Sequence, residues 1–143
     1  MMVLADDGAA LALRVSPREP RTTFGESVEL DVEVHSRNSA VWIPNFLEVG
    51  SNLQVLILGP DGRRIRHVAP HYSYEPFERE TFLKLMPEHY LGRRISVSAR
   101  HFADPGKYEL QVDYHGADDG SHARISAWVG AVRSNVVVVS VEN

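Results

Sequence analysis

Histidine and carboxylate side chains have the greatest chemical potential in this chain, and metal binding is the chemistry that they would support. The sequence contains seven histidines and no cysteine, so a metal site would depend on imidazole and carboxylate ligands. His67 and His71 are four residues apart, a spacing that places two rings on one face of a helix. Pro70 lies between them, however, and in a strand this spacing corresponds to about 13 Å. We therefore predict exposed histidines here rather than a zinc site.

A second group of possible ligands surrounds the turn Asp118-Asp119-Gly120, because His115 and His122 flank the same loop. These side chains could converge on a transition metal, and the acidic turn could offer oxygens to calcium. Zinc sites need three or four converging ligands whose orientation is fixed by hydrogen bonds, and calcium sites need six to eight oxygens. The loop supplies fewer groups than either ion requires, so we predict no metal.

Catalytic motifs are missing from the sequence. It has no Gly-x-Ser-x-Gly elbow and no phosphate-binding glycine loop. Without cysteine it has no thiol nucleophile and no disulfide. Glu78 and Glu80 form a carboxylate pair, but in an extended segment they are neighbours on one solvated face. We therefore predict a chain that is not an enzyme and that holds no cofactor.

Aromatic side chains are crowded into one irregular segment, where Tyr72, Tyr74, Phe77 and Phe82 account for four of the twelve aromatic residues. Such a cluster could stack a sugar or contact a protein, since tyrosine offers a large contact area at a low entropic cost. It could equally be the small core that a long loop needs in order to stay folded. We favour the second interpretation and keep the first open.

Length and composition describe one globular domain. The chain has 143 residues, of which 43% are hydrophobic, and a formal net charge of −4. The 15 lysines and arginines are spread along the chain, which excludes the basic stripe that nucleic-acid binding needs. No apolar run approaches the ~18 residues of a membrane span.

The N-terminal residues are predicted to form a mobile tail over residues 1–9, before a single domain over residues 10–143. Val3-Leu4-Ala5 resembles the end of a small-x-small cleavage site followed by an acidic mature start. This pattern favours an extracytoplasmic protein, periplasmic or secreted, and leaves the cytoplasm as the alternative.

The segment from Asp104 to Tyr114 gives the strongest indication of fold. Pro105-Gly106 predicts a turn, and the residues from Lys107 onwards alternate polar and apolar side chains, which is typical of a strand with one buried face. Tyr108 stands just after the turn, where immunoglobulin-like sandwiches place a tyrosine whose hydroxyl bonds back to nearby backbone. We predict this tyrosine corner at Tyr108.

Other alternating or apolar segments predict further strands, with Trp42 as the buried tryptophan of the core. These segments are residues 10–16, 27–36, 40–46, 53–58, 63–68, 81–85, 95–99 and 135–141. The arginine-rich segment 63–68 is expected at a sheet edge, and the valine-rich segment 135–141 is expected to be covered on both sides. The predicted fold is an all-β, immunoglobulin-like β-sandwich of seven to nine mostly antiparallel strands.

Several of these pieces together resemble a bacterial family of single immunoglobulin-like domains, related to the BsuPI-type intracellular proteinase inhibitor. The matching pieces are Leu11-x-Leu13-x-Val15, Gly25-Glu26, Asn38-Ser39, Pro60-Asp61-Gly62, Leu85-Met86-Pro87 and Asp104-Pro105-Gly106-Lys107-Tyr108. The segment from Trp128 to Asn135 is similar to exported members. Met86-Pro87-Glu88-His89 replaces the Pro-Gly-Glu turn that is usual in such domains. The resemblance implies a fold and no inhibitory residue.

We predict a non-catalytic domain of bacterial origin that binds another protein through the loops at residues 69–80 and 115–122. Its candidate contact residues are His71, Tyr72, Tyr74, Phe77, His115 and His122. One alternative is a carbohydrate-binding module that uses Tyr72, Tyr74 and Trp128. Another is a proteinase inhibitor of the BsuPI type.

Overall fold

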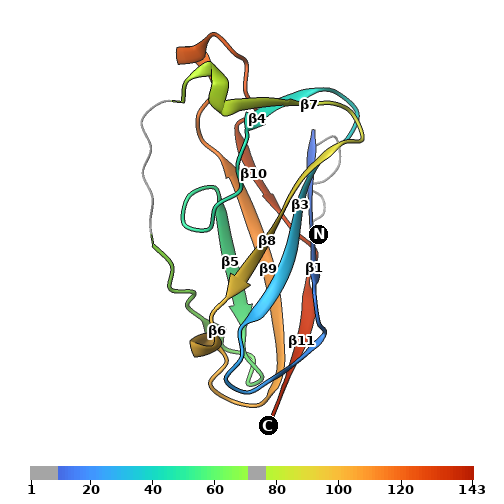
Figure 1. Cartoon of the computed structure of the whole chain (residues 1–143), viewed down its shortest axis with the longest axis vertical. Coiled ribbons are helices and arrows are strands. Elements are labelled where there is room, and N and C mark those ends of the chain that lie inside the picture. The colour runs from blue at the N-terminus through green and yellow to red at the C-terminus, as the bar shows by residue number, and fades with distance from the viewer. Residues whose placement is uncertain (1–9, 71–76) are drawn as a thin grey trace.

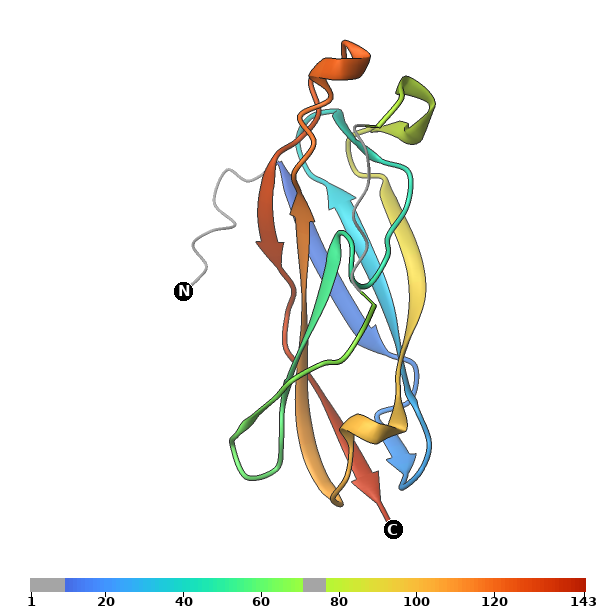
Figure 2. The ribbon, with the colours of Figure 1, turned by 90° about the vertical axis from the view of Figure 1, so that its left-hand side faces the viewer.

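The fold is a β-sandwich, as the alternating sequence pattern predicts. A computed structural model describes residues 10–70 and 77–143, which form eleven strand segments and three short 3-10 helices. Two of the strands have only three and two residues, and the nine longer ones agree with the predicted seven to nine. Two sheets pack face to face, and a small two-stranded sheet lies at one end (Figures 1 and 2). The tail predicted at residues 1–9 lies outside the described residues.

The first sheet has three antiparallel strands in the order β1-β3-β8. They are β1 (Leu11–Pro17), β3 (Val28–Ser36) and β8 (Tyr90–Val97). The central strand β3 alternates fully buried valine and leucine with half-buried polar residues, so one face meets the core and the other meets solvent.

The second sheet has the order β2-β11-β9-β5-β6, and β10 also pairs with β9. Its strands are β2 (Arg21–Thr23), β5 (Leu53–Leu58), β6 (Arg64–Ile65), β9 (Gly106–Gly116), β10 (Gly130–Arg133) and β11 (Val137–Glu142). All pairs are antiparallel except β2 with β11. The segment 63–68 thus lies at the sheet edge as predicted, but only Arg64 and Ile65 form a strand.

The remaining elements lie at the ends of the sandwich. Strand β4 (Val41–Pro44) pairs with β7 (Phe82–Leu85). The 3-10 helices are η2 (Arg79–Thr81), η3 (Ala99–His101) and η4 (Ser121–Ala123). Helix η3 directly precedes the tyrosine corner.

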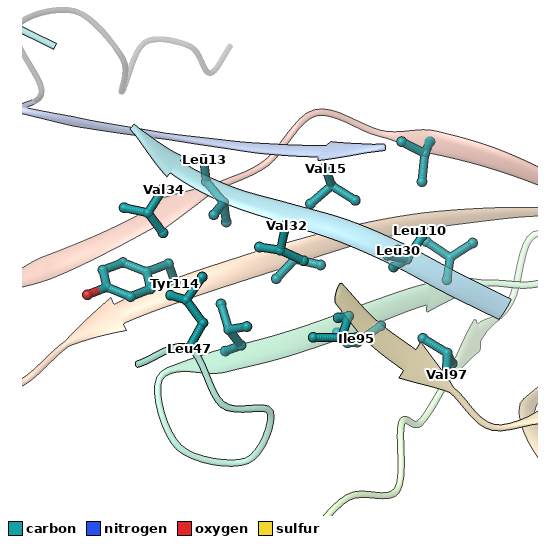
Figure 3. Close-up of a cluster of buried hydrophobic side chains, with 14 of the residues drawn as sticks. Leu13, Val15, Leu30, Val32, Val34, Leu47, Ile95, Val97, Leu110 and Tyr114 are labelled. Carbon is teal, nitrogen blue, oxygen red and sulfur yellow. The ribbon is translucent and has the colours of Figure 1, made fainter. Parts of the chain in front are cut away.

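One hydrophobic core fills the space between the sheets (Figure 3). Strand β3 contributes Leu30 and Val32, β9 contributes Leu110, and β8 contributes Ile95, all of them almost fully buried. Burial of an aliphatic side chain of this size contributes about 1.5–3 kcal/mol, so the core is the main source of stability.

The last strand is broken by a kink between β10 and β11, and side chains satisfy the hydrogen bonds that the kink removes from the ladder. The Ser134 hydroxyl accepts from the Val112 amide at 2.9 Å, and the Ser134 amide donates to the Val112 carbonyl at 2.8 Å. The carboxamide of Asn135 accepts from the Val15 amide and donates to the Val15 carbonyl, both at 2.9 Å. Asn135 therefore acts on β1 as one residue of a neighbouring strand would.

Two predictions about side-chain burial are wrong. Trp42 is half-buried, with the Arg79 guanidinium carbon 5.9 Å from the centre of its ring, because it alternates with Val41 and Ile43, the side chains of β4 that face the core. Strand β11 is covered on one face only: Val138 is 50% exposed, whereas Val139 is fully buried. The outer face of its sheet carries no second layer.

The predicted tyrosine corner is confirmed. The Tyr108 hydroxyl donates to the Asp104 carbonyl at 2.6 Å and accepts from the Asp104 amide at 3.2 Å. Tyr108 is 1% exposed, and its ring packs edge-on against Phe102 at 5.0 Å between ring centres. The corner fixes the turn before β9 to the start of that strand.

Replacing Tyr108 by phenylalanine should lower the free energy of unfolding by about 1–2 kcal/mol, because two main-chain groups of Asp104 lose their partner while the ring stays in place. Urea unfolding followed by tryptophan fluorescence measures the change. Tyr90→Phe is the matched control, since the Tyr90 side chain is 55% exposed and should change stability by less than ~0.5 kcal/mol. Equal unfolding midpoints for Tyr108→Phe and Tyr90→Phe would show that the corner contributes nothing.

Candidate functional site

A groove of about 680 Å³ runs along the edge of β5. Strands β5 and β6 pair only at Ile57–Ile65 and Leu58–Arg64, after which the two chain segments separate. Residues 53–57 form one side of the groove and residues 64–67, 69 and 70 form the other. Residues 49–51 and His115 complete its lining.

Val55 turns its main-chain N–H and C=O groups toward this groove. On β9, the main-chain N–H and C=O of Val112 bond to Ser134, on the side away from β5. Because the direction of these groups alternates along a strand, the main-chain groups of Gln111 and Asp113 point to β5. Their partners on β5 are Leu56 and Gln54, and Val55 between them faces the opposite way. The neighbouring edge positions are taken, because Glu48 and Gly50 bond to Leu53 while Ile57 pairs with β6. Within the described chain, the two main-chain groups of Val55 have no partner on this side.

The groove is cationic although the whole chain is acidic. Its lining includes Arg64, Arg66, His67 and His115, and among the described lining residues there is no aspartate or glutamate. Both arginines are exposed. An arginine offers five N–H donors in a planar fork that matches a carboxylate, so the groove favours anionic groups.

A buried histidine holds the outer wall of the groove in position. The Nε2 atom of His101 lies 3.0 Å from the Val68 amide and can only accept from it, so the proton of the neutral ring is on Nδ1, which donates to the Ser98 carbonyl at 3.0 Å. His67 stacks on this ring with 4.7 Å between ring centres. Burial, and secondarily the neighbouring His101, hold the pKa of His67 below its ordinary value of 6.5.

Of the six candidate contact residues, the structure places one in the groove. His115 lines it, and its amide donates to the Asn52 carbonyl at 2.9 Å. His71, Tyr72 and Tyr74 lie outside the described residues. The arginines of the groove were predicted only as edge-strand residues; the cluster Arg63-Arg64-x-Arg66 was the signal that could have identified them.

Phe77 and His122 lie at the β4–β7 end of the sandwich. Phe77 packs edge-on against Phe46 and Phe82, with 5.6 and 5.8 Å between ring centres, and its amide donates to an Asp118 carboxylate oxygen at 2.9 Å. His122 lies 3.9 Å from a Glu78 carboxylate oxygen. Phe77 therefore packs against the rings of Phe46 and Phe82, and it is half-buried.

Trp128 packs against the sandwich with one face of its ring. Its ring stacks on buried Tyr114 with 5.7 Å between centres, and it covers Gly116 so closely that a Cβ atom there would approach within 2.8 Å of the ring. Burial raises the pKa of the Tyr114 phenol well above its ordinary value. This packing covers one ring face of the tryptophan on which the carbohydrate alternative relies.

Residues 10–70 and 77–143 form neither a metal site nor a membrane-spanning helix. No group of three histidine or acidic side chains there is placed to hold a metal ion. None of the described helices has the length and apolar character needed to cross a membrane.

Topology and the tyrosine corner define this chain as an all-β, immunoglobulin-like sandwich. No protein family and no curated protein matches its sequence. Among solved structures it is similar to a β-glucosidase from Listeria innocua, with a TM-score of 0.48 and 15% identity over 93% of this chain. The chain spans 16% of the length of that enzyme.

Two smaller proteins are also similar in structure. A CARDB domain from Pyrococcus furiosus, solved in complex with di-metal ions, has a TM-score of 0.43 and 13% identity, over 92% of this chain and 86% of that domain. The sporulation control protein Spo0M from Bacillus subtilis has a TM-score of 0.46 and 13% identity, over 94% of this chain and 50% of that protein.

The depressed pKa of His67 predicts how stability depends on pH. The folded state disfavours protonation of this ring, so the stability that depends on a neutral His67 is fully present above pH 6.5, the ordinary pKa. This stability is lost as the pH falls below that value toward the folded-state pKa. We expect the urea midpoint of the wild type to fall more between pH 7.5 and pH 5 than that of His67→Gln. His122→Gln, at an exposed histidine, should keep the wild-type pH dependence. If the urea midpoints of wild type and His67→Gln change equally with pH, the lowered pKa of His67 is contradicted.

Proposed function

We propose that this chain is a non-catalytic interaction domain that binds an acidic, extended segment of a partner protein in the groove along β5. One observation carries the proposal: among the described residues, the groove combines a cationic lining that has no carboxylate with a sheet-edge residue, Val55, whose main-chain groups have no partner. An extended segment could satisfy both features, because its backbone bonds to the edge while its carboxylates meet the arginines.

The two features would contribute in different ways. Contacts between exposed charges are worth about 0–1 kcal/mol each and weaken with salt, so Arg64 and Arg66 would mainly steer and orient an acidic segment. Main-chain bonds to Val55 would be better shielded, since this residue is only 3% exposed. The backbone would then fix the register of the segment, and the charges would select its composition.

The two alternative functions have less support. A carbohydrate-binding surface would need Trp128 to offer a ring face together with Tyr72 and Tyr74, and Trp128 packs against Tyr114. The inhibitor alternative depends on the BsuPI-type resemblance, which supplies no inhibitory residue. A bacterial origin and an extracytoplasmic location stay predictions from the sequence.

Charge reversal in the groove tests the proposal. Random twelve-residue peptides displayed on phage would be selected on the immobilised wild-type protein, and enriched peptides would be measured by fluorescence anisotropy. We expect acidic, extended sequences whose affinity falls with salt and decreases at least tenfold for Arg64→Glu/Arg66→Glu.

Arg18→Glu/Arg21→Glu is the matched control, because it makes the same change in net charge at two exposed arginines on another part of the surface. It should retain most of the affinity for these peptides. Enrichment of basic or neutral peptides only, or an equal loss with both double variants, would overturn the proposal.

A further inference from the structure

Strand β8 is the long open edge of the sandwich. It is the outer strand of the sheet β1-β3-β8, and among the described residues no segment pairs with its other side. Eight consecutive residues pair with β3 in one continuous register, so the strand has no bulge. Figure 2 shows it in yellow at the margin of the molecule.

The direction of the main-chain groups on β8 follows from the hydrogen bonds at its ends. The Ser36 amide donates to the His89 carbonyl, on the β8 side, whereas the Arg18 amide donates to the Glu29 carbonyl, on the β1 side. The main-chain groups of even-numbered residues of β3 therefore point to β8, and those of odd-numbered residues point to β1. The register then directs the odd-numbered residues of β8 to β3. The outward-facing residues are Tyr90, Gly92, Arg94 and Ser96.

All four of these residues are exposed, and their outward N–H and C=O groups have no partner among the described residues. Natural sheets protect such edges with short strands, charged side chains, prolines, bulges or a covering segment. The other edges here are shorter or partly capped: β2 and β6 have three and two residues, and Asn135 caps β1 at Val15. Strand β8 has no proline and no such cap.

The charges on β8 indicate what could occupy this edge. Arg93 and Arg94 lie at its centre and both are exposed. A second copy of this chain paired antiparallel about that centre would bring these arginines against their own copies, which is unfavourable. Arg94 bonds to Asp31 through Nε at 3.1 Å, and its remaining N–H groups are available to a carboxylate on an added strand.

Tyr90 adds an ordered aromatic surface at one end of the edge. Its side chain is 55% exposed, its ring stacks on His35 with 5.0 Å between ring centres, and it covers the neighbouring Gly92. A ring that is already held in place offers contact area at a low entropic cost.

We propose that β8 takes up an extended, acidic segment of another protein as an additional strand. Backbone bonds to Gly92, Arg94 and Ser96 would supply affinity, and Arg94 would select acidic side chains, together with the N–H groups of Arg93 other than the one that bonds to the Leu47 carbonyl. This surface is separate from the groove along β5, so the two proposals stand or fall independently.

To test this proposal, the affinity of each phage-selected peptide is measured for two variants at Ser96. Ser96→Pro removes an outward N–H and places a ring on the open edge, while the ladder to β3 keeps all its bonds because Ser96 does not donate to it. Ser96→Ala is the matched control. We expect one group of acidic peptides to bind wild type and Ser96→Ala with equal affinity. The affinity of these peptides should fall at least tenfold for Ser96→Pro and stay unchanged for Arg64→Glu/Arg66→Glu.

Amide hydrogen exchange measured by NMR supplies the second readout. The amides of Gly92, Arg94 and Ser96 should exchange fast in the free protein and at least tenfold more slowly with the peptide bound, whereas those of Leu91, Arg93 and Ile95 should be slow in both states. The proposal is overturned if every selected peptide keeps its affinity for Ser96→Pro, or if the amides of Gly92, Arg94 and Ser96 exchange equally fast with and without bound peptide. A dimer in sedimentation that Ser96→Pro abolishes would also overturn it, in favour of a second copy.

Discussion

The architecture depends on how the break in the last strand is satisfied. Strand β9 has eleven residues and needs a partner along its whole length, but β10 and β11 meet it as two separate strands. At the break, Ser134 replaces the missing ladder bonds with its hydroxyl and its amide, and the Gln111 side chain donates to the Ser134 carbonyl. Asn135 then bonds across to Val15 of the other sheet. One kink therefore completes the pairing of the central strand and ties the two sheets together.

This arrangement leaves the sheet edges unequal. On the Asn135 side, β1 is capped and β2 covers the end of β11. On the opposite side, β6 pairs with two residues of β5, and β8 has no neighbour among the described residues. Among the described residues, unpaired main-chain groups thus occur on β5 and along β8, and both proposed contact surfaces follow from that asymmetry.

Local patterns predicted the strands well, because period-two burial and turn chemistry are encoded within a few residues. The segment at Tyr108 shows this: the turn, the alternation and the corner are all adjacent in the sequence. Features that depend on distant segments were missed, among them the parallel pairing of β2 with β11 and the packing of Trp128 on Tyr114. The groove belongs to this second kind, since it exists only because β5 and the segment after β6 separate.

The loops attracted attention in the sequence because they hold aromatic and histidine residues, yet some of these residues are used for packing in the folded chain. Phe77 is engaged by two rings and His101 by two hydrogen bonds. The loop at residues 47–52 lies between the two edges: Arg93 of β8 donates to the Leu47 carbonyl, and residues 49–51 line the groove. Arg93 therefore connects the β8 edge to a loop that lines the groove. On a sandwich whose end loops are packed, the unpaired backbone of its edges and the charges beside it are the groups left to recognise a partner.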